Sequence, residues 1–264
     1  MRNILLTISY DGTNFCGWQR QDHSANLKPV RTVQSEIEAA LEKLHTSRRI
    51  ILHGSGRTDS GVHAAAQAAN FFSPIDSIPV NNYIPALNAM LPHDVRIIGA
   101  REVHENFDAR FSATSRVYRY YIAEEEIPLA NQMPYVWFIH RKPDISALNE
   151  MAACLLGETD YAAFAASGDK SVSTKRYVER AAFSYSSAFP SGNFLMFEIE
   201  ANAFLWKMVR SIVGTLIEFE RDGKDALFLK KVLESGDRSM AGVTAPSRGL
   251  FLWQIKFDGV RRHV

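Results

Sequence analysis

Alternation of apolar and polar residues predicts several strands along the chain. The first runs from Ile4 to Tyr10 and ends at an Asp11-Gly12 turn. Similar runs predict further strands at residues 49–53, 95–98, 116–121, 181–185, 193–201 and 250–257. An alanine-rich segment at residues 64–72 is ambiguous, because alanine favours a helix.

Apolar residues at helical spacing predict helices between these strands. Thr32 can cap a helix with one apolar face (Val33, Ile37, Leu41 and Leu44), and Asp144 can cap another that stops at Gly157. Three more helices are expected at residues 81–91, 204–219 and 226–234. Strand–helix–strand units thus occur twice. We predict two α+β halves, an N-terminal half at residues 1–105 and a C-terminal half at residues 106–264.

The composition is that of an ordinary globular protein, with 46% hydrophobic and 22% charged residues among 264. No apolar run approaches the roughly 20 residues of a membrane-spanning helix, and the apolar N-terminal stretch is too short for a signal peptide. Two cysteines, Cys16 and Cys154, make neither a disulfide framework nor a metal cluster. We therefore expect a cytoplasmic protein with no membrane partner.

The net charge of +1, from 30 basic and 29 acidic residues, gives weak support for a nucleic-acid partner. The distribution of charge along the chain is more compatible with a nucleic-acid partner than the total charge is. Basic pairs interleave with Tyr and Trp at Arg116 and Arg119, Arg141 and Lys142, Lys175 and Arg176, and Lys207 and Arg210. Each pair is also what a solvated surface would carry.

The most informative segment is His53-Gly-Ser-Gly-Arg-Thr-Asp-Ser-Gly61, which places Arg57 and Asp59 two positions apart among three glycines. Glycine is used where a backbone bends tightly or approaches a ligand. In an extended segment, side chains two positions apart project from one face. The segment therefore displays a carboxylate beside a cation, as a reactive aspartate would be displayed.

Other interpretations of this loop stay open on the residues alone. An aspartate among Gly, Ser and Thr is commonly a turn residue that bonds its own backbone, and an exposed Arg–Asp pair contributes about 0–1 kcal/mol. The glycine spacing fits neither a nucleotide P-loop nor the dinucleotide fingerprint. His53, Asp59 and His63 could hold a metal ion, but this spacing is not specific, and we expect none.

Residues 56–64, Gly-Arg-Thr-Asp-Ser-Gly-Val-His-Ala, closely resemble the signature of the bacterial tRNA pseudouridine synthase A family, with Ser60 in place of the usual alanine. Four further segments resemble the same family in the family's order. They are Tyr10-Asp-Gly-Thr-Asn-Phe-Cys-Gly-Trp-Gln-Arg20, Arg110-Phe-Ser-Ala-Thr-Ser-Arg-Val-Tyr-Arg-Tyr120, Phe204-Leu-Trp-Lys-Met-Val-Arg-Ser-Ile-Val-Gly214 and Ala245-Pro-Ser-Arg-Gly-Leu250. The resemblance spans essentially the whole chain.

The resemblance implies an α+β pseudouridine synthase fold, in which two similar halves with antiparallel-rich sheets meet at a central cleft. It also favours a strand for residues 64–72. The implied reaction is the isomerisation of uridines at positions thirty-eight to forty of the tRNA anticodon arm. Pseudouridine formation breaks the bond between ribose and uracil N1 and rejoins the base through C5. Since no group is gained or lost, we expect no cofactor.

The resemblance also implies roles for individual residues. Asp59 is the catalytic nucleophile, and Arg210 is the cation that keeps its carboxylate ionised in a closed pocket. Tyr118 is the active-site tyrosine on which the extracted base stacks, and Leu250 is the apolar floor of the pocket. Arg57 then contacts RNA, filling the gap that the base leaves. As isolated residues, a strand tyrosine and a C-terminal leucine are more often core residues.

The resemblance further implies a homodimer that holds tRNA across both subunits. It leaves open whether Trp18 and Gln19 touch RNA or pack inside the protein. Two other classes of function remain as alternatives: an RNA-binding protein without catalysis, and a metal-dependent hydrolase that uses His53, Asp59 and His63. The combination of Asp59, Tyr118 and Arg210 argues against a pure binder, because a carboxylate facing phosphate weakens binding.

Overall fold

The computed structural model describes residues 1–21, 30–124, 126–187, 192–260 and 262. The chain forms two compact units. Unit 1 comprises Met1–Ala113 and Leu252–Asp258, and unit 2 comprises Thr114–Phe251 and Gly259–Val264. The predicted boundary at residue 105 therefore falls inside unit 1, to which the chain also returns near its end.

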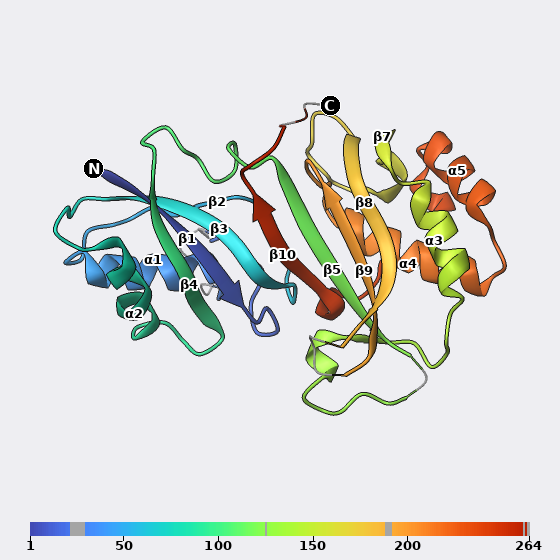
Figure 1. Cartoon of the computed structure of the whole chain (residues 1–264), viewed down its shortest axis with the longest axis horizontal. Coiled ribbons are helices and arrows are strands. Elements are labelled where there is room, and N and C mark those ends of the chain that lie inside the picture. The colour runs from blue at the N-terminus through green and yellow to red at the C-terminus, as the bar shows by residue number, and fades with distance from the viewer. Residues whose placement is uncertain (22–29, 125, 188–191, 261, 263–264) are drawn as a thin grey trace. The chain divides into compact units, whose positions relative to one another are not determined.

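Unit 1 is built on an antiparallel sheet in which β1 (Arg2–Tyr10) lies between β4 (Val95–Val103) and β3 (His63–Ser73) (Figure 1). β2 (His53–Gly54) pairs with β3. Two helices, α1 (Val33–Leu44) and α2 (Tyr83–Asn88), contact each other, and α2 also contacts β4. The apolar side of α1 is buried, with Ile37 and Leu41 fully covered.

Unit 2 contains the strand order β5 (Ser115–Ala123), β9 (Phe194–Ala201), β8 (Lys175–Ser186) and β7 (Gly157–Asp160), with each neighbouring pair antiparallel. A short strand, β6 (Trp137–Phe138), pairs parallel with β5. Three helices cluster together: α3 (Ile145–Ala153), α4 (Met208–Arg221) and α5 (Ala226–Ser235) (Figure 1). The last strand, β10 (Leu250–Lys256), begins in unit 2, and its residues from Leu252 belong to unit 1.

The predicted α+β class is confirmed, and the local signals located most elements. Thr32 caps α1 through a capping box with Ser35, and Asp144 accepts hydrogen bonds from the first amides of α3. The alanine-rich segment is strand β3, which pairs with β1 along most of its length. Pairing in the sheet thus overrides the helix propensity of alanine.

Several predicted bounds were wrong, and three of the differences have a clear description. The strand expected at residues 49–53 is reduced to the two residues of β2. α3 ends at Ala153, and Gly157 opens β7 instead of stopping the helix. α4 begins at Met208 and not at residue 204, because Lys207 has a left-handed backbone with φ of 61° that interrupts the helix. In the described part of the chain, no helix is both long enough and apolar enough to cross a bilayer.

Candidate active site

The loop that carries Asp59 is attached to the segment between β1 and α1 on both sides of the aspartate. Before it, the Thr58 carbonyl accepts a hydrogen bond from the Trp18 amide at 3.1 Å. After it, the Ser60 hydroxyl and the Gly61 amide donate to the Phe15 carbonyl at 3.1 and 3.3 Å. The serine that replaces the family's alanine therefore adds a bond to the anchor and leaves the aspartate in place.

The anchoring segment is itself held by the first turn of α1. The amides of Val33 and Gln34 donate to the carbonyls of Gly17 and Trp18 at 3.2 and 3.0 Å. The first amides of a helix have no partner within the helix. Here they hold the segment that in turn holds the loop of Asp59, so the position of Asp59 depends on the start of α1.

Two buried aromatic side chains of unit 1 lie against the loop and its anchoring segment. The Tyr10 hydroxyl at the end of β1 shares a hydrogen bond of 2.8 Å with the Thr58 hydroxyl. Trp18 is 1% exposed, its ring lies 6.0 Å from that of Tyr10, and it packs against Gly54. The question that the sequence left open for Trp18 is thus answered: it packs inside unit 1.

His63 is fully buried, and its Nδ1 accepts a hydrogen bond from the Gly12 amide at 3.0 Å. The Asp11 carboxylate lies 3.1 Å from the same nitrogen. His53, by contrast, is exposed. Within the described residues, no three His, Cys, Asp or Glu side chains are grouped closely enough to hold a metal ion.

A relay of polar side chains leads from Arg57 into the interior of unit 1. The Arg57 Nε donates to the Gln19 Oε1 at 3.2 Å, and the Gln19 amide nitrogen donates to the Gln34 Oε1 at 2.6 Å. The Gln34 amide nitrogen then donates to the Glu38 carboxylate at 2.9 Å. Gln34 and Glu38 are each 7% exposed, and Arg20 pairs with Glu38 at 3.1 Å.

The Glu38 carboxylate, together with the Leu52 carbonyl and the Arg20 amide, sets the direction of this relay. A carboxylate only accepts hydrogen bonds, so it draws the NH₂ end of the Gln34 amide toward itself. The oxygen of Gln34 must then face Gln19, and the oxygen of Gln19 must face Arg57. Gln19 therefore presents an acceptor to Arg57, which restrains the direction of the guanidinium.

In unit 2, Tyr118 and Arg210 occupy fixed surroundings near the N-terminus of α4. The half-buried Tyr118 ring packs edge-on against Phe204, with centroids 4.9 Å apart. The Arg210 Nε donates to the Ala245 carbonyl at 2.8 Å, and the Ala245 amide donates back to the Arg210 carbonyl at 3.0 Å. This two-way contact fixes the stem of the arginine to the segment that leads to Leu250.

Tyr120 joins the same segment, because its hydroxyl donates to the Pro246 carbonyl at 2.7 Å. Burial raises the pKa of Tyr120 above its ordinary value, and the positive charges of Arg210 and Arg248 only partly oppose this. The phenol is therefore a neutral donor at physiological pH. Leu250 is 6% exposed and follows a short 3-10 helix, Ser247–Gly249, at the start of β10.

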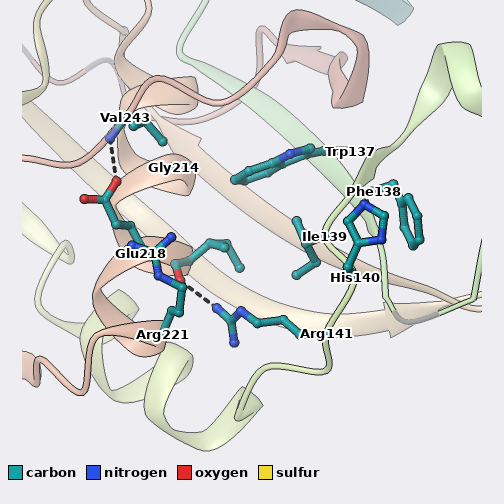
Figure 2. A pocket seen from close by; sticks show the side chains of 10 residues that line it. Trp137, Phe138, Ile139, His140, Arg141, Gly214, Glu218, Arg221 and Val243 are labelled. Atoms are coloured by element: carbon teal, nitrogen blue, oxygen red, sulfur yellow. Dashed lines mark hydrogen bonds between the residues drawn. The ribbon is translucent and has the colours of Figure 1, made fainter.

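Unit 2 also contains a hollow of about 490 Å³ between the β6 region and α4, which includes none of the predicted site residues (Figure 2). Two of its polar side chains hold the main chain. Arg141 donates to the Ile217 carbonyl at 2.7 Å, and the Glu218 carboxylate accepts the Val243 amide at 3.0 Å. This hollow is therefore distinct from the candidate site.

The predicted site residues fall into two groups. Asp59 and Arg57 lie in unit 1, whereas Tyr118, Arg210 and Leu250 lie in unit 2. The family model described as tRNA pseudouridine synthase matches residues 6–112 and 151–258, which include all five except Tyr118.

The chain belongs to the tRNA pseudouridine synthase family. It is 54% identical to the tRNA pseudouridine synthase A of Treponema denticola, over 97% of this chain and 93% of that protein. The corresponding protein of Treponema pallidum is 48% identical over 92% of this chain and 84% of its own length. That of Brachyspira hyodysenteriae is 42% identical over 97% and 99%. The fold expected for this family, an α+β pseudouridine synthase fold, agrees with the elements described above.

The sequence did not single out Gln34 and Glu38, although both support the signature loop of this pseudouridine synthase family member. Their signal was present: they are polar residues four positions apart on α1, beside apolar Ile37 and Leu41. Such a pair is normally assigned to the solvated face of a helix. Only the structure shows that both side chains are buried.

Gly17 tests how far the loop depends on its anchor. Its φ is +90°, and a Cβ atom there would lie 2.5 Å from the Thr58 carbonyl oxygen. We expect Gly17→Ala to lower the free energy of unfolding by about 1–3 kcal/mol, since the backbone would be strained and the loop displaced. The measurement is urea unfolding followed by circular dichroism.

Gly56→Ala is the matched control in the same loop. A Cβ atom at Gly56 would meet no heavy atom within 4 Å. Its free energy of unfolding should stay within about 1 kcal/mol of the wild-type value. Equal unfolding midpoints for Gly17→Ala and the wild type would show that the contact with Thr58 does not constrain the loop.

Proposed function

We propose that this chain is a cofactor-independent isomerase that converts uridines to pseudouridine at positions thirty-eight to forty of the tRNA anticodon arm. Family membership supports the reaction class, and the relatives named above are tRNA pseudouridine synthases A. The observation that carries the proposal for the site is the loop of Asp59, which is pinned to the Phe15–Trp18 segment before and after the aspartate. A turn aspartate would not need this double attachment.

The reaction exchanges one bond of the base for another. The glycosidic bond between C1′ and N1 breaks, the uracil rotates, and C1′ bonds to C5. The proton on C5 is lost, and N1 gains a proton, so atoms and electrons balance without an oxidant or a second substrate. Asp59 acts as the nucleophile, since a carboxylate can form a covalent intermediate and leave again.

Arg210 keeps the Asp59 carboxylate charged in this proposal. Closing a pocket around a carboxylate removes water and disfavours its ionised form, and a nearby guanidinium offsets this cost. The Arg210 side chain is suited to the role because its Nε is fixed to the Ala245 carbonyl. A fixed guanidinium loses less conformational freedom when it pairs with a carboxylate.

The remaining residues bind the target nucleotide. The uridine must leave the helical stack, at a cost of a few kcal/mol. Stacking on Tyr118 returns roughly 1–3 kcal/mol, and Leu250 forms the apolar floor beneath the base. Arg57, exposed at the edge of the loop, fills the space that the base leaves in the RNA. The proposal includes a cytoplasmic homodimer that holds tRNA across both subunits.

Replacing Asp59 tests the catalytic assignment. We expect Asp59→Ala and Asp59→Asn to abolish pseudouridine formation while tRNA binding stays within about threefold of wild type, because loss of a carboxylate near RNA removes repulsion and no phosphate contact. Pseudouridine is measured in a tRNA transcript, with variants that lack uridine at each target position. Asp76→Asn changes an exposed aspartate of unit 1 and should retain full activity.

Two outcomes would overturn this assignment. Activity of the Asp59 variants would remove the aspartate from the mechanism. Tight tRNA binding without isomerisation by the wild-type protein would instead favour an RNA-binding protein.

Gln19 tests whether the relay orients Arg57 for RNA. Gln19→Leu removes the acceptor for the Arg57 Nε, so we expect KM for tRNA to rise by up to about tenfold, the equivalent of one hydrogen bond to a charged group. The value of kcat should change little. Gln21→Leu, at an exposed neighbouring position, is the control.

A double-mutant cycle decides whether Gln19 acts through Arg57. If it does, Gln19→Leu adds no further defect to Arg57→Ala. Additive effects would show that Gln19 has a role of its own.

A further inference from the structure

An exposed tryptophan stands immediately before α4. Trp206 is 45% exposed, whereas its neighbours Leu205 and Met208 are 4% and 0% exposed. Leaving so much of an indole ring in water forgoes part of the free energy that its burial would supply. Single exposed apolar residues are common on protein surfaces, so exposure alone has no functional meaning here.

What distinguishes Trp206 is how firmly its backbone is held. Its amide donates to the Asp169 carboxylate at 2.5 Å, and its carbonyl accepts the Ala166 amide at 3.0 Å. Although burial acts in the opposite direction, hydrogen bonds from Ser171 and from the Trp206 amide hold the pKa of Asp169 below its ordinary value. The carboxylate is therefore ionised at neutral pH, and the contact persists.

One edge of the ring lies near Gly168. A Cβ atom at Gly168, where φ is +88°, would be in ordinary van der Waals contact with the Trp206 Cζ3, at 3.8 Å. Lys207 directly follows Trp206 and has a left-handed backbone conformation, with φ of 61°. Its Nζ is 4.7 Å from the centre of the indole ring. A left-handed lysine is unfavourable and persists only where its surroundings enforce it.

Trp206 also adjoins residues already proposed to hold the target nucleotide. Phe204, two positions earlier, packs edge-on against Tyr118. Arg210 is the third residue of α4, three positions after Lys207. An exposed aromatic ring and an ammonium group are therefore close in sequence to Arg210 and to Phe204, the packing partner of Tyr118.

We infer that Trp206 is a stacking platform for a nucleotide next to the target uridine in the RNA, and that Lys207 contacts the phosphate of that nucleotide. The inference rests on the proposed function and adds a binding site to it. When the target base leaves the stack, its neighbour loses a stacking partner, and its exposed face becomes available. An indole ring replaces that partner for any base, because every base has a π-face.

The affinity for tRNA tests the platform. We expect Trp206→Ala to weaken tRNA binding by about five- to a hundredfold, and Trp206→Phe to recover most of the loss because an aromatic face remains. The value of kcat at saturating tRNA should stay within about twofold. Leu227→Ala, which removes an exposed apolar side chain on α5, is the control and should bind as wild type does.

A fluorescent base locates the contact. An anticodon stem-loop with 2-aminopurine beside the target uridine should be quenched by the wild-type protein and by Asp59→Asn, and markedly less by Trp206→Ala. Because this signal needs no turnover, it separates failure of the platform from failure of the proposed reaction. Equal binding and equal quenching by the wild type and Trp206→Ala would overturn the platform, whether or not the enzyme forms pseudouridine.

Lys207→Asn tests the phosphate contact separately. Asparagine tolerates the left-handed backbone, so this variant removes the charge and keeps the turn. We expect the slope of log affinity against log salt concentration to fall by about one. An unchanged slope would remove Lys207 from the binding site.

Discussion

The site in unit 1 depends on the hydrogen bonds that the amides in the first turn of α1 donate outside the helix. Two of these amides hold the carbonyls of Gly17 and Trp18, and the same short segment binds the loop of Asp59 on both sides of the aspartate. Helix, segment and loop thus form one continuous set of main-chain hydrogen bonds. Main-chain bonds tolerate changes of side chain, which explains why Ser60 can replace alanine beside the aspartate without loosening the loop. Gly17 is the exception, because the approach to Thr58 leaves no room for a Cβ atom.

A buried carboxylate has a different task in the same unit. Glu38 accepts hydrogen bonds from Gln34 and from the Leu52 amide, and pairs with Arg20. Its charge is therefore compensated, as a buried charge requires. An amide side chain can point either way unless its neighbours fix it. At Gln34 the Glu38 carboxylate and the Leu52 carbonyl accept from the NH₂ group, and the Arg20 amide donates to the oxygen. The relay is therefore directional, and Arg57 meets an oxygen of Gln19 and not an NH₂ group.

The sequence predicted those parts of the fold that local rules determine. β1 and the cap of α1 follow from alternation and from Thr32, and both are found as expected. β3 could be assigned only through the family resemblance, because its alanines favour a helix and only pairing in the sheet selects a strand. The start of α4 was missed because no pattern of apolar residues reveals a left-handed Lys207. For the site, the motifs gave Asp59 and Arg210 as candidates, and these roles stay predictions. Burial of Gln34 and Glu38 depends on tertiary packing, which the spacing of residues does not reveal.

Two of the positions with a positive φ lie beside candidate site residues. Gly17 contacts the loop that carries Asp59, and Lys207 immediately precedes the helix that carries Arg210. Strained backbone persists only where the surroundings enforce it, and such positions concentrate at functional sites. Glycine adopts a positive φ without strain, so only Lys207 has an unfavourable backbone at these two positions. It directly follows Trp206, which is exposed between the buried Leu205 and Met208. This enforced backbone beside an exposed ring is the physical reason for proposing that Trp206 binds substrate.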